Sequence, residues 1–309
     1  MTQRSVLVPL DGSRLAEAVM PLVGRLAKAV DASVTLLHVL EDHSPDEIHG
    51  DRHLSESVGA HAYLDSVAES LREAGVAEIA LHVHENREHD VARAIVQHAN
   101  EFAADLVVLA NHGSGGMREF LFGTIAQKVI RQGTIPVITV PVRHLSDMPP
   151  YSGLKSIVMA LNGTAEAEAA LEPTVWIAQG YDVPVRVVAA VETAATMTGE
   201  NRVIASMIPS ATRAVLQIQE EATREYLKGV VALLEARGVR ASNVMLRGDP
   251  VGAITTEAIQ SGAGLLVLAT HGRSGLGGLW AGSVGSRVLG KYGKPLLLVH
   301  APDGGENAD

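Results

Sequence analysis

A short passage whose residue types could bind an anion occurs twice in this chain. The first copy runs Leu109-Ala110-Asn111-His112-Gly113, then nine residues, then Gly123-Thr124. The second runs Leu268-Ala269-Thr270-His271-Gly272, then nine residues, then Gly282-Ser283. Each copy follows an apolar run and precedes a helical pattern. A strand, a glycine-bearing loop and a helix N-terminus together offer backbone N–H groups and a helix dipole to a phosphate. We therefore expect two nucleotide-sized sites, or one site and a degenerate copy.

The residues at the two ends of the passage have separate tasks. Gly113 and Gly272 allow the backbone to approach a ligand closely and to adopt positive φ. Gly123 and Gly282 do the same where the helix begins. The hydroxyl residues that follow them, Thr124 and Ser283, are favoured helix N-caps and can also reach a phosphate oxygen.

The composition limits the classes of protein to consider. The 309 residues are 47% hydrophobic and 19% charged, which is typical of globular domains. Aromatic residues make up only 3%, so the core must consist of aliphatic side chains, as in a buried parallel sheet covered by helices. A net charge of -10 argues against general binding to nucleic acid or to an anionic membrane. There are no cysteines, which excludes disulfides, thiolate metal sites and cysteine nucleophiles. We expect a cytoplasmic protein.

Apolar runs alternate with helical patterns, and the pattern repeats in two halves. Ser5 to Gly12 (SVLVPLDG) matches Ser156 to Gly163 (SIVMALNG). We predict strands near residues 5–10, 33–40, 79–84, 105–110 and 136–140, and again near 156–160, 185–191, 243–247, 264–269 and 295–299. Helices are expected near residues 13–30, 56–74, 90–102 and 124–132, and a longer one in the second half at about 211–236. Pro21 and Pro173 should kink the first helix of each half.

These patterns predict an α/β protein with two tandem doubly wound domains, each a Rossmann-like five-stranded parallel sheet. The domains would span residues 1–145 and 154–302, with a linker at 143–153 and a tail at 303–309. Ligands of such sheets bind outside the carboxyl ends of the strands, where the strand order reverses. Asp11 lies at the end of the first strand; it could face a ligand or simply cap the helix that starts near Ser13.

The doubled passage and the opening Val8-Pro9-Leu10-Asp11-Gly12-Ser13 resemble the universal stress protein family. Its nucleotide-binding members carry Gly, two residues, Gly, nine residues, then Gly-Ser or Gly-Thr. Thr270-His271-Gly272-Arg273-Ser274-Gly275 is also typical of the family. The resemblance covers nearly the whole chain. It implies an adenine nucleotide alpha hydrolase-like fold and an ATP site in each half, with or without Mg²⁺.

The resemblance also assigns individual residues. In the first half it places at the adenosine, ribose and phosphates Pro9, Leu10, Asp11, Val39, Leu109, Ala110, His112, Gly113, Gly123, Thr124 and Ile125. In the second half the corresponding set is Ala160, Asn162, Val191, Leu268, Ala269, His271, Gly272, Arg273, Gly282, Ser283 and Val284.

The chain departs from the family pattern at three of these positions. The first glycine of the pattern is Ala110 in one half and Ala269 in the other, and Asn162 stands where the first half has Asp11. The second half instead carries a cation, Arg273, near the expected phosphates. We therefore expect two unequal sites.

Two further patterns invite misreading. The run from Gly285 to Lys291 imitates a phosphate-binding P-loop, but it ends in Tyr292 and lies inside a helical pattern. His82 and His84 would share one strand face, a spacing that can chelate metal, but without carboxylate or cysteine company polar surface residues are the simpler interpretation. We predict no metal site.

The function that we predict is nucleotide-dependent regulation without catalysis. The alternatives are an interaction module of the same fold that binds no nucleotide, and a slow ATPase. Family members usually dimerise, often through the last strand. Here the strands at 137–140 and 296–299 could instead pair the two halves internally as a pseudo-dimer. A protein partner is expected but not identified.

Overall fold

The fold was analysed in a computed structural model, which describes residues 3–41, 47–48, 51–52, 54–88, 90–111, 124–142, 153–197, 203, 207–271 and 284–301. Most of the predicted linker, the tail, and the loops at 112–123 and 272–283 lie outside these ranges. Among the described helices, none combines the length and the apolar character that crossing a bilayer requires.

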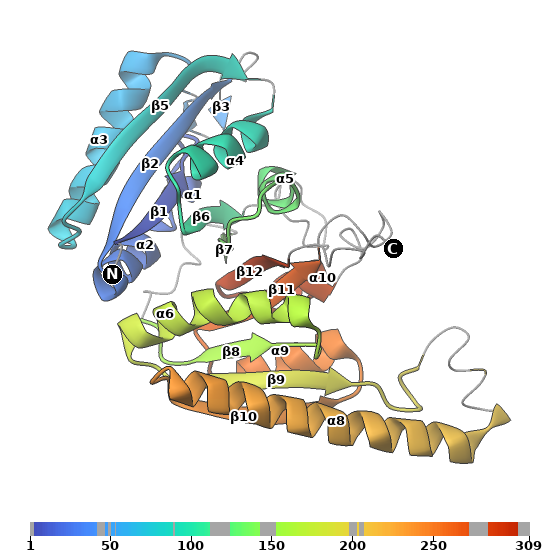
Figure 1. Ribbon diagram of the computed structural model, residues 1–309. Coiled ribbons are helices and arrows are strands. Elements are labelled where there is room, and N and C mark those ends of the chain that lie inside the picture. Colours follow the sequence, from blue (N-terminus) through green and yellow to red (C-terminus); the bar gives the residue numbers. More distant parts are fainter. Residues whose placement is uncertain are drawn as a thin grey trace, which may run out of the picture.

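Each half alternates strands and helices (Figure 1). The first half contains β1 (Arg4–Pro9), α1 (Arg14–Glu17), α2 (Met20–Val30), β2 (Ala32–Glu41), the short β3 (Glu47–Ile48) and β4 (Asp51–Arg52), α3 (Ser57–Glu73), β5 (Ile79–Glu88), α4 (Val91–Glu101), β6 (Leu106–Asn111), α5 (Thr124–Gln132) and β7 (Val137–Pro141). The second contains β8 (Ile157–Ala160), the 3₁₀ helix η2 (Ala165–Ala170), α6 (Leu171–Tyr181), β9 (Val185–Val191), α8 (Pro209–Ala236), β10 (Ala241–Arg247), α9 (Pro250–Gln260), β11 (Leu265–His271), α10 (Val284–Tyr292) and β12 (Leu296–Ala301).

The ten long strands form one continuous sheet in the order β10-β9-β8-β11-β12-β7-β6-β1-β2-β5. Within each half the strands are parallel, and the order is the same in both. The doubly wound α/β fold and all ten predicted strands are thereby confirmed. The strand order reverses beside β1 in the first half and beside β8 in the second. The carboxyl ends of β1 and β6, and of β8 and β11, are therefore the expected ligand edge.

Helices cover both faces of the sheet, and each strand contributes alternate residues to the two faces. Val6 and Val8 pack under α2 and α3 in one apolar cluster, whereas Leu7 packs on the opposite face under α4 and α5. Both clusters continue through the second half, beneath α6 and α8 on one side and α9 and α10 on the other. The halves therefore share their cores, as a continuous sheet requires.

The prolines interrupt the first helix of each half more strongly than the sequence suggested. We expected one kinked helix over residues 13–30, but the structure has two separate helices, with Pro21 near the start of the second. Pro173 occupies the corresponding place behind a 3₁₀ turn. Proline lacks the N–H and clashes with the carbonyl of the fourth residue before it, so the preceding turn cannot continue as an α-helix.

The α8 helix is the largest difference between the halves. It has 28 residues, whereas its counterpart α3 has 17, as the longer helical pattern predicted. Figure 1 shows α8 extending past the strands it covers. Its fully packed residues, Leu227, Val230 and Leu234, all lie in its C-terminal part.

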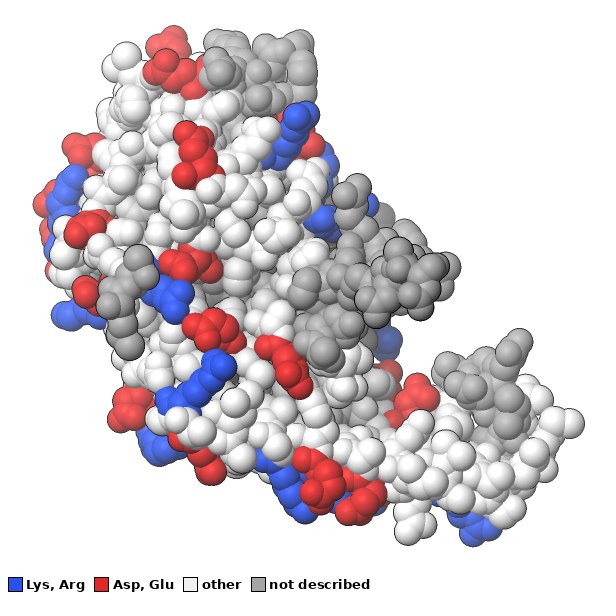
Figure 2. Space-filling model, viewed as in Figure 1, with Lys and Arg blue, Asp and Glu red and all other residues white. Residues whose placement is uncertain are grey.

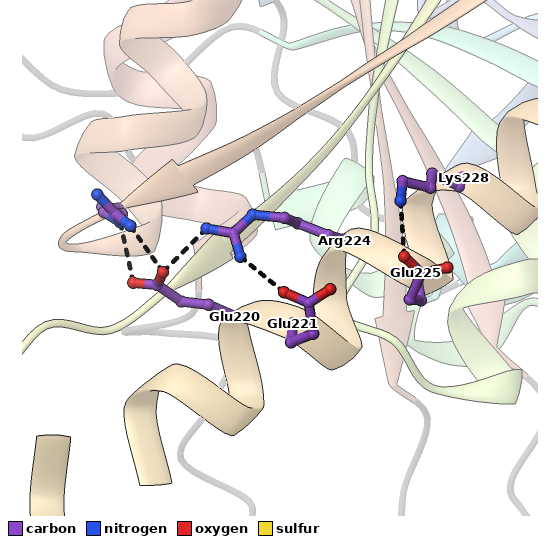
Figure 3. A network of polar contacts seen from close by, with 6 residues as sticks. Glu220, Glu221, Arg224, Glu225 and Lys228 are labelled. Atoms are coloured by element: carbon purple, nitrogen blue, oxygen red, sulfur yellow. Dashed lines mark hydrogen bonds and ion pairs between the residues drawn. The ribbon is translucent and has the colours of Figure 1, made fainter. Parts of the chain in front are cut away.

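A charged network fixes the middle of α8 to the sheet edge (Figure 3). Glu220 accepts two hydrogen bonds, of 2.9 and 2.6 Å, from the guanidinium of Arg247 at the end of β10. Arg224 bridges Glu220 and Glu221 one turn on, and Lys228 contacts Glu225. Apart from Glu220 these side chains are largely exposed, so the network orients the helix without contributing much stability.

The two halves meet through a strand pair and a helix pair. β12 pairs antiparallel with β7, with Ile138 opposite Leu297, so the internal pairing expected from the sequence is present. Behind it, α6 packs on α2 so closely that a Cβ at Gly180 would lie 2.5 Å from Val30 Cγ1 and 2.7 Å from the Ala29 carbonyl oxygen. Only glycine fits at this position.

Arg4 adds a polar connection across the same boundary. Its guanidinium pairs with Asp105 in its own half at 2.8 Å and with Glu172 of α6 at 3.3 Å, and it stacks over Trp176. The strand pair, the helix pair and Arg4 together make the tandem halves one unit.

Candidate functional site

The loop after β1 turns sharply at the ligand edge. Asp11 Oδ1 accepts hydrogen bonds from the Ser13 backbone N–H at 2.9 Å and from the Ser13 hydroxyl at 2.7 Å. Ser13 in turn caps α1 by accepting from the Ala16 N–H. Gly12 between them has φ +92°, a conformation that L side chains rarely adopt. Ser13, not Asp11, is therefore the helix cap, and Asp11 holds the turn that precedes it.

The second half builds the same loop from different residues. Asn162 Oδ1 accepts from the Thr164 N–H at 3.2 Å and from its hydroxyl at 2.9 Å. Thr164 accepts from the Ala167 N–H, and Gly163 has φ +82°. The turn needs a side-chain oxygen at this position but not a negative charge.

Acidic side chains surround the first of these loops. Burial, followed by the nearby Asp51 and Asp11 charges, raises the pKa of Glu17, while the neighbouring Tyr63 hydroxyl opposes the rise. Burial, followed by the charges of Glu17, Asp11 and Asp51, raises the pKa of Tyr63. In the second half Glu168 faces Tyr226, whose pKa burial and this carboxylate raise to about 12. The first loop is thus the more acidic of the two.

The other predicted residues of the first half lie at neighbouring strand ends. The Leu10 N–H donates to Leu37, which joins the ends of β1 and β2. Val39 and Leu109 are buried on the same face of the sheet, while Ala110 packs toward the other face. Pro9 is half-buried at the end of β1. The structure therefore brings together the residues expected around the adenosine.

The second half repeats this arrangement with one change of residue. Ala160 lies opposite Leu268 in the β8–β11 register, and Ala269 follows toward the other face. Ala160 also lies opposite Val188, just as Pro9 lies opposite Leu37. By that register Ala190, not Val191, is the structural counterpart of Val39, and Ala190 packs on the same face. The constant spacing between the two halves over the first two strands was the signal that could have identified Ala190.

Much of the predicted phosphate end lies outside the described residues, namely His112, Gly113, Gly123, Gly272, Arg273, Gly282 and Ser283. Thr124 and Ile125 lie in the first turn of α5, and both are exposed. The backbones of His271 and Val284 belong to β11 and α10. The run ending at Lys291 lies within α10, and the Tyr292 hydroxyl donates to the Ala263 carbonyl oxygen at 2.7 Å, which confirms that it is no P-loop.

Two carboxylates that we did not single out connect the helices behind the ligand edge. Asp90, just before α4, lies 3.5 Å from Lys128 of α5 and accepts from Gln132. Burial works against its ionisation, but Gln132 and Lys128 outweigh it and hold the pKa of Asp90 below its usual range. Asp249 caps α9 and lies 3.8 Å from Arg287 of α10. Their equivalent places before a helix in each half were a usable signal.

His82 and His84 share a face of β5 as predicted, and they face His98 of α4. His84 Nδ1 lies 2.9 Å from His98 Nε2, and His98 Nδ1 lies 3.0 Å from Glu101. Burial and then the His98 charge lower the pKa of His82. Within the described residues, no three or more His, Asp or Glu side chains are arranged to hold a metal ion. The imidazoles contact one another instead.

The charge on one face of the described residues and one interior cavity were the remaining places to look for a site. On the face shown in Figure 2, acidic and basic side chains of the described residues are interspersed rather than gathered into a basic patch. A cavity of about 10 Å³ lies between α4, α5 and the sheet, lined among others by Val96, Val107 and Gly133. It has room for about one water molecule, so it is no nucleotide pocket.

Comparison with known proteins decides the family. The model of the universal stress protein family matches residues 3–141 and again 153–300. The chain belongs to the universal stress protein family. Its two matched segments are tandem domains of that family, as the doubled passage indicated.

Individual relatives agree with this assignment. A universal stress protein of Mycolicibacterium smegmatis is 25% identical over an alignment 331 positions long, which covers 96% of this chain and 97% of the relative. A universal stress protein of Synechocystis is 30% identical over 139 residues, 45% of this chain and 85% of the relative. The crystal structure of a universal stress protein from Archaeoglobus fulgidus has a TM-score of 0.68 at 16% identity, covering 97% of this chain and 100% of that chain. It shows the fold that the two proteins share.

Proposed function

We propose that this universal stress protein is a cytoplasmic regulatory module that binds ATP, with or without Mg²⁺, at one or both halves. The observation that carries the proposal is the repeated loop at the ligand edge. Asp11–Ser13 and Asn162–Thr164 adopt the same turn, each beside the strand whose end continues into the doubled passage. An identical turn built twice at the switch in strand order fits a binding function better than a purely structural one.

The described residues fit a nucleoside. Buried aliphatic side chains stand at the strand ends, Val39 and Leu109 in the first half and Ala160 and Leu268 in the second, and would offer a base an apolar surface. Asp11 and Asn162 lie next to these ends and offer oxygens to ribose hydroxyl groups. The bound nucleotide would supply the negative phosphates, and Thr124 opens α5, whose N-terminus would attract them.

The first half should bind the nucleotide more tightly. Its loop carries the Asp11 carboxylate, and hydrogen bonds from hydroxyl groups to an ionised acceptor are stronger than those to a neutral amide. The second half instead carries the cation Arg273 in its copy of the doubled passage, which would favour the phosphates. Binding would stabilise residues 111–122 and 270–281 and so change the surface offered to a partner protein or a second copy.

Two alternatives keep the same fold. An interaction module without nucleotide is favoured by Ala110 and Ala269, whose methyl groups replace glycine hydrogens in the family pattern. A slow ATPase would need groups that stabilise the transferred phosphoryl, and the sequence offers no Walker lysine for that task. We therefore place regulation ahead of catalysis.

Calorimetric titration of the full chain with MgATP, paired with thermal unfolding, tests the proposal. We expect saturable heat and a higher Tm, because a ligand that binds only the folded state stabilises it. Gly113→Val and Gly272→Val should each remove one site, and the double variant both. Gly229→Ala in α8, where an added Cβ meets nothing within 4 Å, is the control that should bind normally.

The alternatives give different results in the same experiment. No heat and no change in Tm would contradict nucleotide binding and support the interaction module. Phosphate release that the double variant abolishes would show an ATPase.

A further inference from the structure

The histidine cluster between β5 and α4 has a hydrogen-bonding pattern that depends on its protonation. His98 is 8% exposed and stacks on Phe102, with ring centroids 5.2 Å apart. The His82 and His84 rings lie 4.5 and 5.0 Å from the His98 ring. Three imidazoles thus meet at the contact between the edge strand and a helix.

Only certain proton arrangements preserve this contact. A 2.9 Å contact between His84 Nδ1 and His98 Nε2 requires a proton on one nitrogen and a lone pair on the other. If both imidazoles are protonated, two N–H groups and two positive charges face each other. The Glu101 carboxylate, 3.0 Å from His98 Nδ1, supports one positive charge in the cluster but not two.

The other elements around His98 bring little compensating charge. β5 contributes His82 and His84, and α4 contributes Glu101. Strand β2 faces α4 with the apolar Leu37 and Val39. The charged residue of α5 that contacts this part of the fold, Lys128, pairs with Asp90, about 12 Å along the helix axis from His98.

The cluster is adjacent to the nucleoside end of the first site. His84 lies opposite Val39 in the β5–β2 register. Val39 also shares a buried cluster with Ala92 and Ile95 of α4. A change in how α4 rests on β5 therefore reaches the residue expected to face the adenosine.

The described part of the second half has no such cluster. Its residues in the equivalent register positions of β10 are Val244 and Leu246, opposite Val188 and Ala190. On α9, Glu257 stands in the place of His98 and pairs with Arg186 at 2.6 Å. This half has a carboxylate–guanidinium pair where the first has paired imidazoles, so it serves as an internal control within the same chain.

We propose that the His84–His98–Glu101 cluster makes nucleotide binding by the first half sensitive to pH, while the second half is insensitive. When acidification adds a second proton to the pair, an N–H group stands on both facing nitrogens and the His84–His98 hydrogen bond is lost. The α4 helix then holds β5 and Val39 less firmly, and the first site releases its nucleotide. The inference rests on the nucleotide binding proposed above.

Hydrogen exchange without nucleotide tests the geometric part directly. After correction for the intrinsic exchange rate, residues 91–101 should lose about fivefold in protection between pH 8 and pH 5.5, which corresponds to one ordinary hydrogen bond. Residues 250–260 should not change. His84→Leu, which introduces the residue of the second half, and His98→Gln, which keeps hydrogen bonding without titrating, should each reduce the dependence to the part that His82 contributes. Equal protection of residues 91–101 at both pH values in the wild-type protein would overturn the inference.

Exchange measured during MgATP titration then separates this inference from the proposed function. ATP should protect residues 32–41 and 185–191 at pH 8, and at pH 5.5 the concentration needed for the first segment alone should rise about fivefold. Protection at pH 8 that is equal at pH 5.5 would overturn the inference and leave nucleotide binding intact. No protection by ATP at either pH would overturn the proposed function, and the regulatory inference with it. The role of this cluster would also be contradicted if His84→Leu and His98→Gln both left the pH dependence of that ATP concentration undiminished.

Discussion

The two halves of the molecule make the same turn with different residues. Asp11 and Asn162 each accept two hydrogen bonds from the hydroxyl residue two positions on, and a glycine with positive φ lies between. The fold therefore needs a side-chain oxygen at this position, but it does not need that oxygen to carry a negative charge. The carboxylate of the first half and the amide of the second can therefore give the two sites different binding properties without changing the turn.

At the boundary between the halves, by contrast, packing requires equivalent positions to carry different residues. In α2 and α6 the equivalent positions are Ala29 and Gly180, and they face each other across the pseudo-twofold relation of the halves. A Cβ at position 180 would overlap Val30 and the Ala29 carbonyl oxygen, so the second half carries glycine where the first has alanine. Both helices then end in an aspartate with left-handed backbone, Asp31 and Asp182.

The largest effect is expected from restoring symmetry at this boundary. Gly180→Ala should lower the free energy of unfolding by about 1–3 kcal/mol, because the added Cβ meets Val30 and the Ala29 carbonyl oxygen. Gly229→Ala in α8 makes the same chemical change without contacts and should raise it by up to about 1 kcal/mol. Urea unfolding of both variants measures the difference. Equal effects of the two substitutions would show that the halves do not pack tightly here.

The second effect concerns the charge at the repeated turn. Asp11→Asn should leave the turn intact, because Asn162 already supports it, while ATP affinity of the first half falls about tenfold with loss of a charge-assisted acceptor. Asp11→Ala removes the oxygen itself and should also destabilise the fold by about 1–2 kcal/mol. Calorimetry and thermal unfolding separate the two consequences. Destabilisation by Asp11→Asn as large as that by Asp11→Ala would mean that the fold needs the charge.

A smaller effect is expected from His82, which Val244 replaces in the second half. Burial and the neighbouring His98 lower the pKa of His82, so the folded state keeps it neutral where the unfolded chain already takes up a proton. Stability should therefore fall as the pH drops below about 6.5, the unfolded value. His82→Val should reduce this slope in denaturant unfolding measured between pH 8 and pH 5.5. An unchanged slope would assign the pH dependence to other groups.

The smallest effect is expected at the α8 network, which the first half lacks. Arg247→Ala removes both bonds to Glu220, but the Arg247 side chain is 57% exposed. The free energy of unfolding should change by no more than about 0.5–1 kcal/mol. The same unfolding assay measures it, with Lys228→Ala, at a pair not anchored to the sheet, as the control.

Sequence reasoning predicted the strands well because a buried parallel sheet has a simple signature. Runs such as the one from Ser5 to Leu10 are apolar on both faces, and the repeat supplied each run a second time. It failed at Pro21, where the strength of a helix break depends on how the following turn packs. It chose Val191 over Ala190 because the choice followed the apolar pattern of the strand and did not apply the constant spacing between the halves, which sets the face of each residue.

The candidate site was predictable where it follows the chain and not where it depends on contacts between distant segments. Asp11 and Asn162 stand out because they end matching strands. The contact between His84 and His98 does not, because it requires knowing that α4 lies on the edge strand and which of its faces points inward. The pairing of Asp90 with Lys128 is hidden for the same reason.

The claim that one turn carries two different strengths of nucleotide site is tested most directly by exchanging the two residues. Exchange protection by MgATP should be followed in residues 32–41 and 185–191 of the wild-type chain and of the double variant Asp11→Asn, Asn162→Asp. The first half should be protected at the lower ATP concentration in the wild-type protein, and the order should reverse in the double variant. An unchanged order, or no protection of either half, would contradict the account.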